Sequence, residues 1–190
     1  ADYAIERDTA MQCFQWFRER NMTFACFMQN EIAAFAGEAA AEDIYWCAPW
    51  NDPRAPRILK GEEAVRRFTE GRVNKFVCIE RDREQLQALG RRLETLPGLE
   101  ITSSWADNYE LMPRGVSKGR AVKELAEKMG IGPDQVMTVG DFDNDLSMIE
   151  YAGYGTAMGN ATPKVKAAAK YVTLTNDEDG VAAAIRKYVL

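Results

Sequence analysis

The stretch VMTVGDFDND, residues 136–145, joins a short apolar run to three aspartates at alternate positions. Its apolar part, Val136–Val139, is typical of a strand buried on both faces of a parallel sheet. Gly140 follows directly, so the acidic residues come where this strand ends. Because ligands of open α/β sheets bind at the carboxyl ends of the strands, a site is expected here.

The residues around this stretch alternate between helical and strand patterns, after a Pro/Gly turn signal at 112–115. Ser117 is expected to cap a helix that Gly130 ends. The apolar face of that helix should comprise Ala121, Val122, Leu125, Ala126 and Met129. The later patterns predict helices at 144–152, from Thr162-Pro163 and at 178–188, and strands at 154–158 and 171–174. Such alternation predicts a parallel sheet with crossover helices.

The preceding residues predict a second α/β part with a smaller mixed sheet, so we expect domains at 1–112 and 113–190. Helices are predicted at 8–20, 62–70 and 82–96, the first capped by Asp8-Thr9, and strands at 23–29, 75–80, 99–105 and 109–112. The pattern of 38–43 is ambiguous. Residues 48–56 contain three prolines and are expected to form a loop.

Composition narrows the chemistry of this 190-residue chain. A net charge of -5 and the lack of a basic run argue against nucleic acid as a partner. No apolar run reaches the roughly 18 residues of a membrane span, and the acidic N-terminal residues do not resemble a signal peptide. We interpret the four cysteines, which form no CxxC pair, as reduced thiols of a cytoplasmic protein: Cys13, Cys26, Cys47 and Cys78. The absence of histidine excludes Ser-His and Cys-His nucleophiles and histidine-bound metals.

The aspartates of residues 141–145 allow more than one interpretation. Acidic side chains at a helix N-terminus are favoured by the helix dipole, which would suffice for one of them. A calcium loop of the EF-hand type needs glycine at its sixth position and glutamate at its twelfth, which are Leu146 and Ala152 here. The calcium interpretation is therefore weak.

A magnesium site explains more of this stretch. Mg²⁺ takes one or two carboxylates together with water and phosphate oxygens. Asp141 at the strand end is placed to be a direct ligand, and the helix brings Asp145 back toward the same point, whereas Asp143 should face solvent or the loop. Lys118 begins the preceding helix, where the dipole does not favour a cation. Lys118 is therefore either a solvated surface lysine or a point charge for a phosphoryl group.

Four runs of the sequence carry a resemblance to a known family: VSKGRAVKELAEKMGI (116–131), VMTVGDFDND (136–145), GYGTAMGNATPKVKAAAKYVT (153–173) and NDEDGVAAAI (176–185). Together they resemble the haloacid dehalogenase (HAD) superfamily, and more narrowly its Cof-type sugar-phosphate phosphatases. The similarity is dense from about Arg114 onward and looser before it. It implies an α/β fold, with part of the Rossmann-like parallel sheet of the HAD core and an α/β cap domain with a small mixed or antiparallel sheet.

The resemblance also implies Mg²⁺-dependent hydrolysis of small phosphorylated metabolites through a phospho-aspartate. Lys118 matches the family lysine that offsets charge on the nucleophile and phosphate. Asp141 matches the acid that ligates Mg²⁺, and Asp145 matches the second acid of that motif. Asn144 matches a polar residue that often orients the phosphate side. Catalysis of such a transfer consists mostly of positioning and charge stabilisation.

The nucleophile motif of the family, an apolar strand followed by DxDGT, is not found in the sequence. The run Asp177-Glu178-Asp179-Gly180 has a similar spacing, but Thr175 and Asn176 separate it from the strand, and Val181 replaces a hydroxyl residue. Asp177 and Glu178 suit a helix cap and first turn. The chain therefore looks like a Cof-type protein without its first segment, and it is expected to be nearly inactive alone.

An incomplete sheet has further consequences. The strand at Val136–Val139 should have a bare edge, which a homodimer could cover. A non-enzymatic module for a ligand or a partner is the alternative function, and the cap-like part could bind it through tryptophans, namely Trp16, Trp46, Trp50 and Trp105. The bland interpretation of these tryptophans is that most belong to the core.

Overall fold

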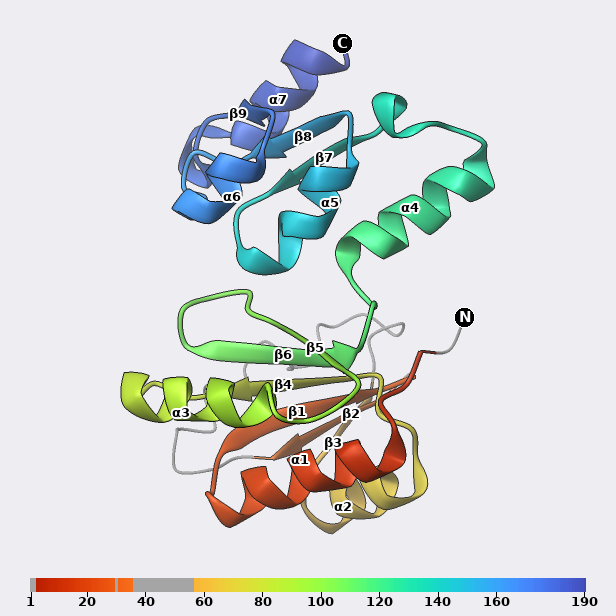
Figure 1. Ribbon diagram of the computed structural model, residues 1–190, viewed down its shortest axis with the longest axis vertical. Helices are drawn as coiled ribbons and strands as arrows, with labels where there is room; N and C mark the ends of the chain where they lie inside the picture. The colour runs from red at the N-terminus through yellow and green to blue at the C-terminus, as the bar shows by residue number, and fades with distance from the viewer. Residues whose placement is uncertain (1–2, 30, 36–56) are drawn as a thin grey trace. The chain divides into compact units, whose positions relative to one another are not determined.

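The computed structural model describes residues 3–29, 31–35 and 57–190 (Figure 1). The expectations for 38–43 and 48–56, and for Cys47, Trp46 and Trp50, lie outside the described residues. The chain divides into two compact units, Ala1–Arg114 and Gly115–Leu190, which are described separately below. Within the described ranges, no helix has both the length and the apolar character needed to cross a membrane.

The first unit is built on a six-stranded mixed sheet with strand order β3-β2-β1-β4-β6-β5. Its strands are β1 (Thr23–Met28), β2 (Glu31–Phe35), β3 (Arg57–Leu59), β4 (Lys75–Ile79), β5 (Leu99–Thr102) and β6 (Asn108–Pro113). Only the β2–β3 pair is parallel. This sheet is larger than expected, because the sequence patterns predicted neither β2 nor β3.

Helices cover one face of this sheet: α1 (Arg7–Glu19), α2 (Gly61–Glu70) and α3 (Arg83–Leu93). They meet alternate residues of the strands in one core, whose fully buried aromatic members are Phe17, Phe24, Phe68 and Phe76. Asp82 caps α3 at the start of the predicted helix. The predicted cap of α1 by Asp8-Thr9 is wrong, because α1 begins after Glu6 and Asp8 lies in its first turn. A core of this size explains why the first unit forms a compact body.

The second unit has a three-stranded sheet, β7-β8-β9, in which every pairing is parallel. Its strands are β7 (Met137–Gly140), β8 (Tyr154–Ala157) and β9 (Tyr171–Val172), and its helices are α4 (Lys118–Met129), α5 (Leu146–Tyr151), α6 (Pro163–Ala168) and α7 (Gly180–Tyr188). The predicted α/β fold class is confirmed, with a parallel sheet following a mixed one (Figure 1).

Local signals for α4 and α6 are confirmed. The Ser117 hydroxyl accepts from Arg120 N, Gly130 adopts a left-handed conformation (φ 70°), and Thr162 caps α6 ahead of Pro163. The predicted apolar face of α4 is only partly buried, because Leu125 and Met129 are 59% and 64% exposed. The buried stripe of α4 instead follows Gly119 and Ala126, with Val122 beside them.

Candidate active site

The acidic loop, residues 141–145, starts where β7 ends, and its last residue folds back onto its first. Asp145 Oδ2 accepts the backbone N–H groups of Asp141 at 2.9 Å and Phe142 at 3.4 Å. Gly140 makes this return possible, because a Cβ there would lie 2.4 Å from the Cβ of Asp145. The Asp145 residue is only 5% exposed. The loop is therefore a turn closed around one buried carboxylate.

Lys118 reaches the same carboxylate from the first turn of α4. Its Nζ forms an ion pair with Asp145 Oδ1. The next residue, Gly119, packs α4 closely against α5. Gly119 N donates to Ser147 Oγ at 3.0 Å, and the backbones are so close that an added Cβ on Gly119 would lie 2.3 Å from Ser147 O. Because only glycine permits this approach, the α4–α5 contact positions Lys118.

The other acidic side chains of the loop have different environments. Asp141 is exposed, and its Oδ2 accepts from Asn160 Nδ2 at 3.3 Å. Asp143 forms an ion pair with Lys164 Nζ at 3.0 Å, which leaves it one-third exposed. Asn144 is half-buried in the 3₁₀ turn Asp143–Asp145. Of the predicted site residues, the structure thus joins Lys118 to Asp145 directly and places Asp141 at the rim of the same loop.

Sequence reasoning missed two residues that contact the acidic loop, Asn160 and Lys164. Both belong to the segment after β8, and Thr162 N also donates to Asp141 O at 3.0 Å. The only signal was topological, because consecutive parallel strands bring their carboxyl ends to one edge of the sheet. These contacts make the acidic loop part of a larger surface at the carboxyl ends of the strands.

The oxygen ligands at the carboxyl ends of these strands suit a hard divalent cation that takes few of its ligands from the protein. Asp141 offers an exposed carboxylate, whereas Asp145 already holds two backbone donors and an ammonium. The described residues contain no cluster of three acidic, cysteine or histidine side chains that could enclose a metal. Mg²⁺ commonly takes one or two carboxylates, with water and phosphate oxygens at its other positions. The residues present fit such an ion, with Asp141 as the available ligand.

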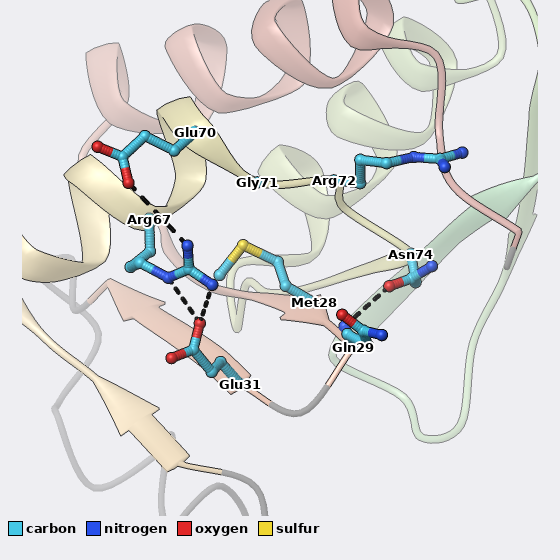
Figure 2. Close-up of a pocket in the computed structure, with 8 residues that line it drawn as sticks. All are labelled: Met28, Gln29, Glu31, Arg67, Glu70, Gly71, Arg72 and Asn74. Carbon is cyan, nitrogen blue, oxygen red and sulfur yellow. Dashed lines mark hydrogen bonds and ion pairs between the residues drawn. The ribbon is translucent and has the colours of Figure 1, made fainter.

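A groove in the first unit is a second candidate. It has a volume of about 410 Å³ and is lined by Met28, Gln29, Glu31, Arg67, Glu70, Gly71, Arg72 and Asn74. Figure 2 shows two of its polar contacts: Arg67 Nε donates to Glu31 at 2.7 Å, and Gln29 N donates to Asn74 Oδ1 at 3.0 Å. Because these groups satisfy each other, the groove points less clearly to a ligand than the acidic loop does.

Comparisons with known proteins show which family the chain resembles. A sequence model described as haloacid dehalogenase-like hydrolase matches residues 1–185. Among curated relatives, "Phosphatase YwpJ" of Bacillus subtilis (strain 168) is 48% identical over 53% of this chain and 35% of its own length. "5-amino-6-(5-phospho-D-ribitylamino)uracil phosphatase YcsE" of the same organism is 50% identical over 48% of this chain and 37% of its length. The chain therefore spans about a third of these curated relatives.

The fold is also found in a solved structure, described as a haloacid dehalogenase-like hydrolase from B. subtilis. It superposes with a TM-score of 0.80 over 98% of this chain and 72% of that chain, at 28% sequence identity. The match takes in both units, so the arrangement of elements in each has a counterpart in a known protein.

Proposed function

Because the chain belongs to the haloacid dehalogenase-like hydrolases, we propose that it supplies part of a phosphatase site for small phosphate esters, such as sugar phosphates. This part would contain the Mg²⁺ ligand and the lysine that faces the phosphate. The predicted relationship to the HAD superfamily and its Cof-type phosphatases is confirmed. The observation that carries the proposal is the Lys118–Asp145 ion pair beside the exposed Asp141 carboxylate, at the carboxyl ends of parallel strands.

Each residue of this site has a proposed role. Asp141 would hold Mg²⁺, which when bound supplies positive charge to the oxygens of the phosphate. Lys118 would place an ammonium beside the transferring phosphoryl group, and Asp145 would keep that ammonium in place while closing the loop. Asp145 could also serve as a second ligand if Lys118 shifts toward phosphate. Asn144 would orient the phosphate from the 3₁₀ turn.

The nucleophile is proposed to lie outside these residues. In the resembled family the phospho-aspartate forms on the first aspartate of an Asp-x-Asp motif at a strand end, and such spacings occur here only within 141–145 and at 177–179. The second spacing belongs to a turn rather than a strand end: Glu178 Oε2 accepts from Thr175 N at 3.2 Å and from Thr175 Oγ1 at 2.7 Å. This turn is a capping box, so Thr175 rather than Asp177 starts it. The chain alone is therefore proposed to be catalytically incomplete.

The location and assembly of the protein are proposed on separate observations. Cys13, Cys26 and Cys78 are buried free thiols, which suits a reducing cytoplasm.

Among described strands β7 pairs with β8 alone, so a second copy is proposed to cover its open edge. Every exposed large hydrophobic side chain of the described residues lies in the second unit: Leu125, Met129, Val172, Leu174, Val181, Ile185, Val189 and Leu190.

Hydrolysis of an aryl phosphate in the presence of Mg²⁺ tests the proposal, with the chain assayed beside Asp141→Asn. We expect no turnover above the variant, because the covalent step lacks its nucleophile. Turnover that disappears in Asp141→Asn would support a phosphatase but contradict catalytic incompleteness, and would reopen Asp177 and Asp179 as nucleophiles. Ligand-induced stabilisation by a compound without a phosphate group would instead favour the alternative, a non-enzymatic binding module.

A further inference from the structure

We propose that Asn160 is a positioning residue, which fixes the Asp141 carboxylate in the orientation that binds a divalent cation. The inference rests on the proposed function, because it takes Asp141 as a metal ligand. Asn160 lies in the loop between β8 and α6, outside the acidic loop, and neither the sequence motifs nor the roles proposed above assign it a task.

The side-chain amide of Asn160 is held at both ends. Its Oδ1 accepts from Asn176 N at 3.0 Å, and its Nδ2 donates to Asp141 Oδ2 at 3.3 Å. A backbone N–H can only donate, so the oxygen of the amide must face Asn176. This contact removes the ambiguity of an amide flip and directs the NH₂ group toward Asp141.

The loop that carries Asn160 is itself fixed between neighbouring strand ends. Met158 N donates to Gly140 O at 2.9 Å, and Gly159 N donates to Leu174 O at 2.9 Å. Gly159 lies so close to the chain after β9 that a Cβ would be 2.7 Å from Thr175 N. Asn160, in the loop after β8, therefore bridges the segments that follow β7 and β9.

This bridge acts on an otherwise exposed carboxylate. The terminal torsion of an aspartate side chain is broad, so an unsupported Asp141 would lose freedom when it binds a cation. With Oδ2 held by Asn160 and the backbone O held by Thr162 N at 3.0 Å, Oδ1 is left for the ion. Hydrogen bonds to ligating carboxylates typically change metal affinity by 10–100-fold. Because Asn160 is exposed, a loss of roughly 10-fold is expected.

The test is Mn²⁺ affinity, measured by the electron paramagnetic resonance signal of free Mn²⁺ in titrations of the whole chain. We expect Asn160→Ala to weaken Mn²⁺ binding by roughly 10-fold. Asn176→Ala is the matched control, because its contact with Asn160 comes from a backbone N–H that the substitution retains.

The outcomes separate the inference from the proposed function. Unchanged Mn²⁺ affinity in Asn160→Ala, together with loss of binding in Asp141→Asn, would overturn the positioning role and leave the metal site intact. Full affinity in Asp141→Asn, or no binding by the wild-type chain, would overturn both. If Asn160→Ala fails to fold, the wild-type chain decides by NMR. The side-chain amide resonance of Asn160 should shift when Mg²⁺ is added, and that of Asn21 in the first unit should not; an unshifted Asn160 resonance would overturn the inference.

Discussion

Lys118 and Asp145, which are 27 positions apart in the chain, form an ion pair whose carboxylate side chain is 6% exposed and whose lysine side chain is 49% exposed. The same carboxylate closes the acidic loop through Asp141 N and Phe142 N. The buried Asp145 carboxylate therefore both closes the acidic loop and holds the ammonium group of Lys118. Among the described side chains, Lys118 is the only cation paired with this carboxylate.

Asp145→Asn should destabilise the second unit, because the amide keeps the size of the side chain but leaves Lys118 without a counter-charge. Removing one partner of a buried pair costs about 3–5 kcal/mol, and the half-exposed lysine lowers the expectation to about 2 kcal/mol. Hydrogen exchange of the β7 and α5 amides should become roughly 30-fold faster. Asp143→Asn is the control: its pair with Lys164 is exposed, so a change below about 0.5 kcal/mol is expected. Equal effects of both substitutions would contradict the role of Asp145.

Gly119→Ala should separate α4 from α5 and displace Lys118. The added Cβ would lie 2.3 Å from Ser147 O, a backbone atom that cannot rotate away. A loss of about 2–4 kcal/mol in unfolding free energy of the second unit is expected, again measured by hydrogen exchange. Gly130→Ala provides the comparison, because its φ of 70° strains an alanine by about 1–2 kcal/mol but nothing lies within 4 Å. A milder effect at Gly119 than at Gly130 would count against the α4–α5 contact as the device that positions Lys118.

The open edge of β7 predicts concentration-dependent self-association in sedimentation velocity. Met137→Lys should shift the chain toward monomer, because a lysine on an edge strand opposes pairing with another strand. Gln87→Lys adds the same charge at an exposed position of α3, outside the β7-β8-β9 sheet. It should leave association unchanged. A chain that stays monomeric at all concentrations would rule out the proposed homodimer.

The buried thiols predict a pH dependence of the first unit. Burial raises the pKa of Cys13 from 9.0 to about 12. Stability from the neutral thiol is therefore fully present below about pH 9 and is lost as pH rises toward 12. Urea unfolding followed by tryptophan fluorescence should show this loss. All four tryptophans precede residue 106, so the signal comes from the first unit. Cys13→Ala should lose less stability over the same range, and an identical pH profile would contradict the assignment.

Local signals allowed much of the second unit to be predicted. Ser117, Gly130 and Thr162 act through contacts within a few residues, so their positions in the sequence suffice. β3 was missed because it has only three residues, and β2 because β1 is followed by Gln29, which adopts a left-handed conformation (φ 33°) without being glycine. Such a turn leaves no glycine signal in the sequence.

The site shows the same division between local and long-range information. The spacing of Asp141 and Asp145 indicated a shared location, since both belong to one loop. Asn160 was not predicted, because its partners lie 19 and 16 positions away and meet it only when three strand ends assemble. Leu125 and Met129 belong to the predicted apolar face of α4 but are exposed, because periodicity marks an apolar stripe without showing what covers it.

The central claim is that the acidic loop holds a divalent cation through Asp141. Counting bound Mn²⁺ by electron paramagnetic resonance on the wild-type chain, Asp141→Asn and Asp143→Asn tests it most directly. The account predicts one ion per chain, loss of that ion in Asp141→Asn, and its retention in Asp143→Asn, whose carboxylate is paired with Lys164. Retained binding in Asp141→Asn, or equal losses in both variants, would contradict the assignment of Asp141 as the metal ligand.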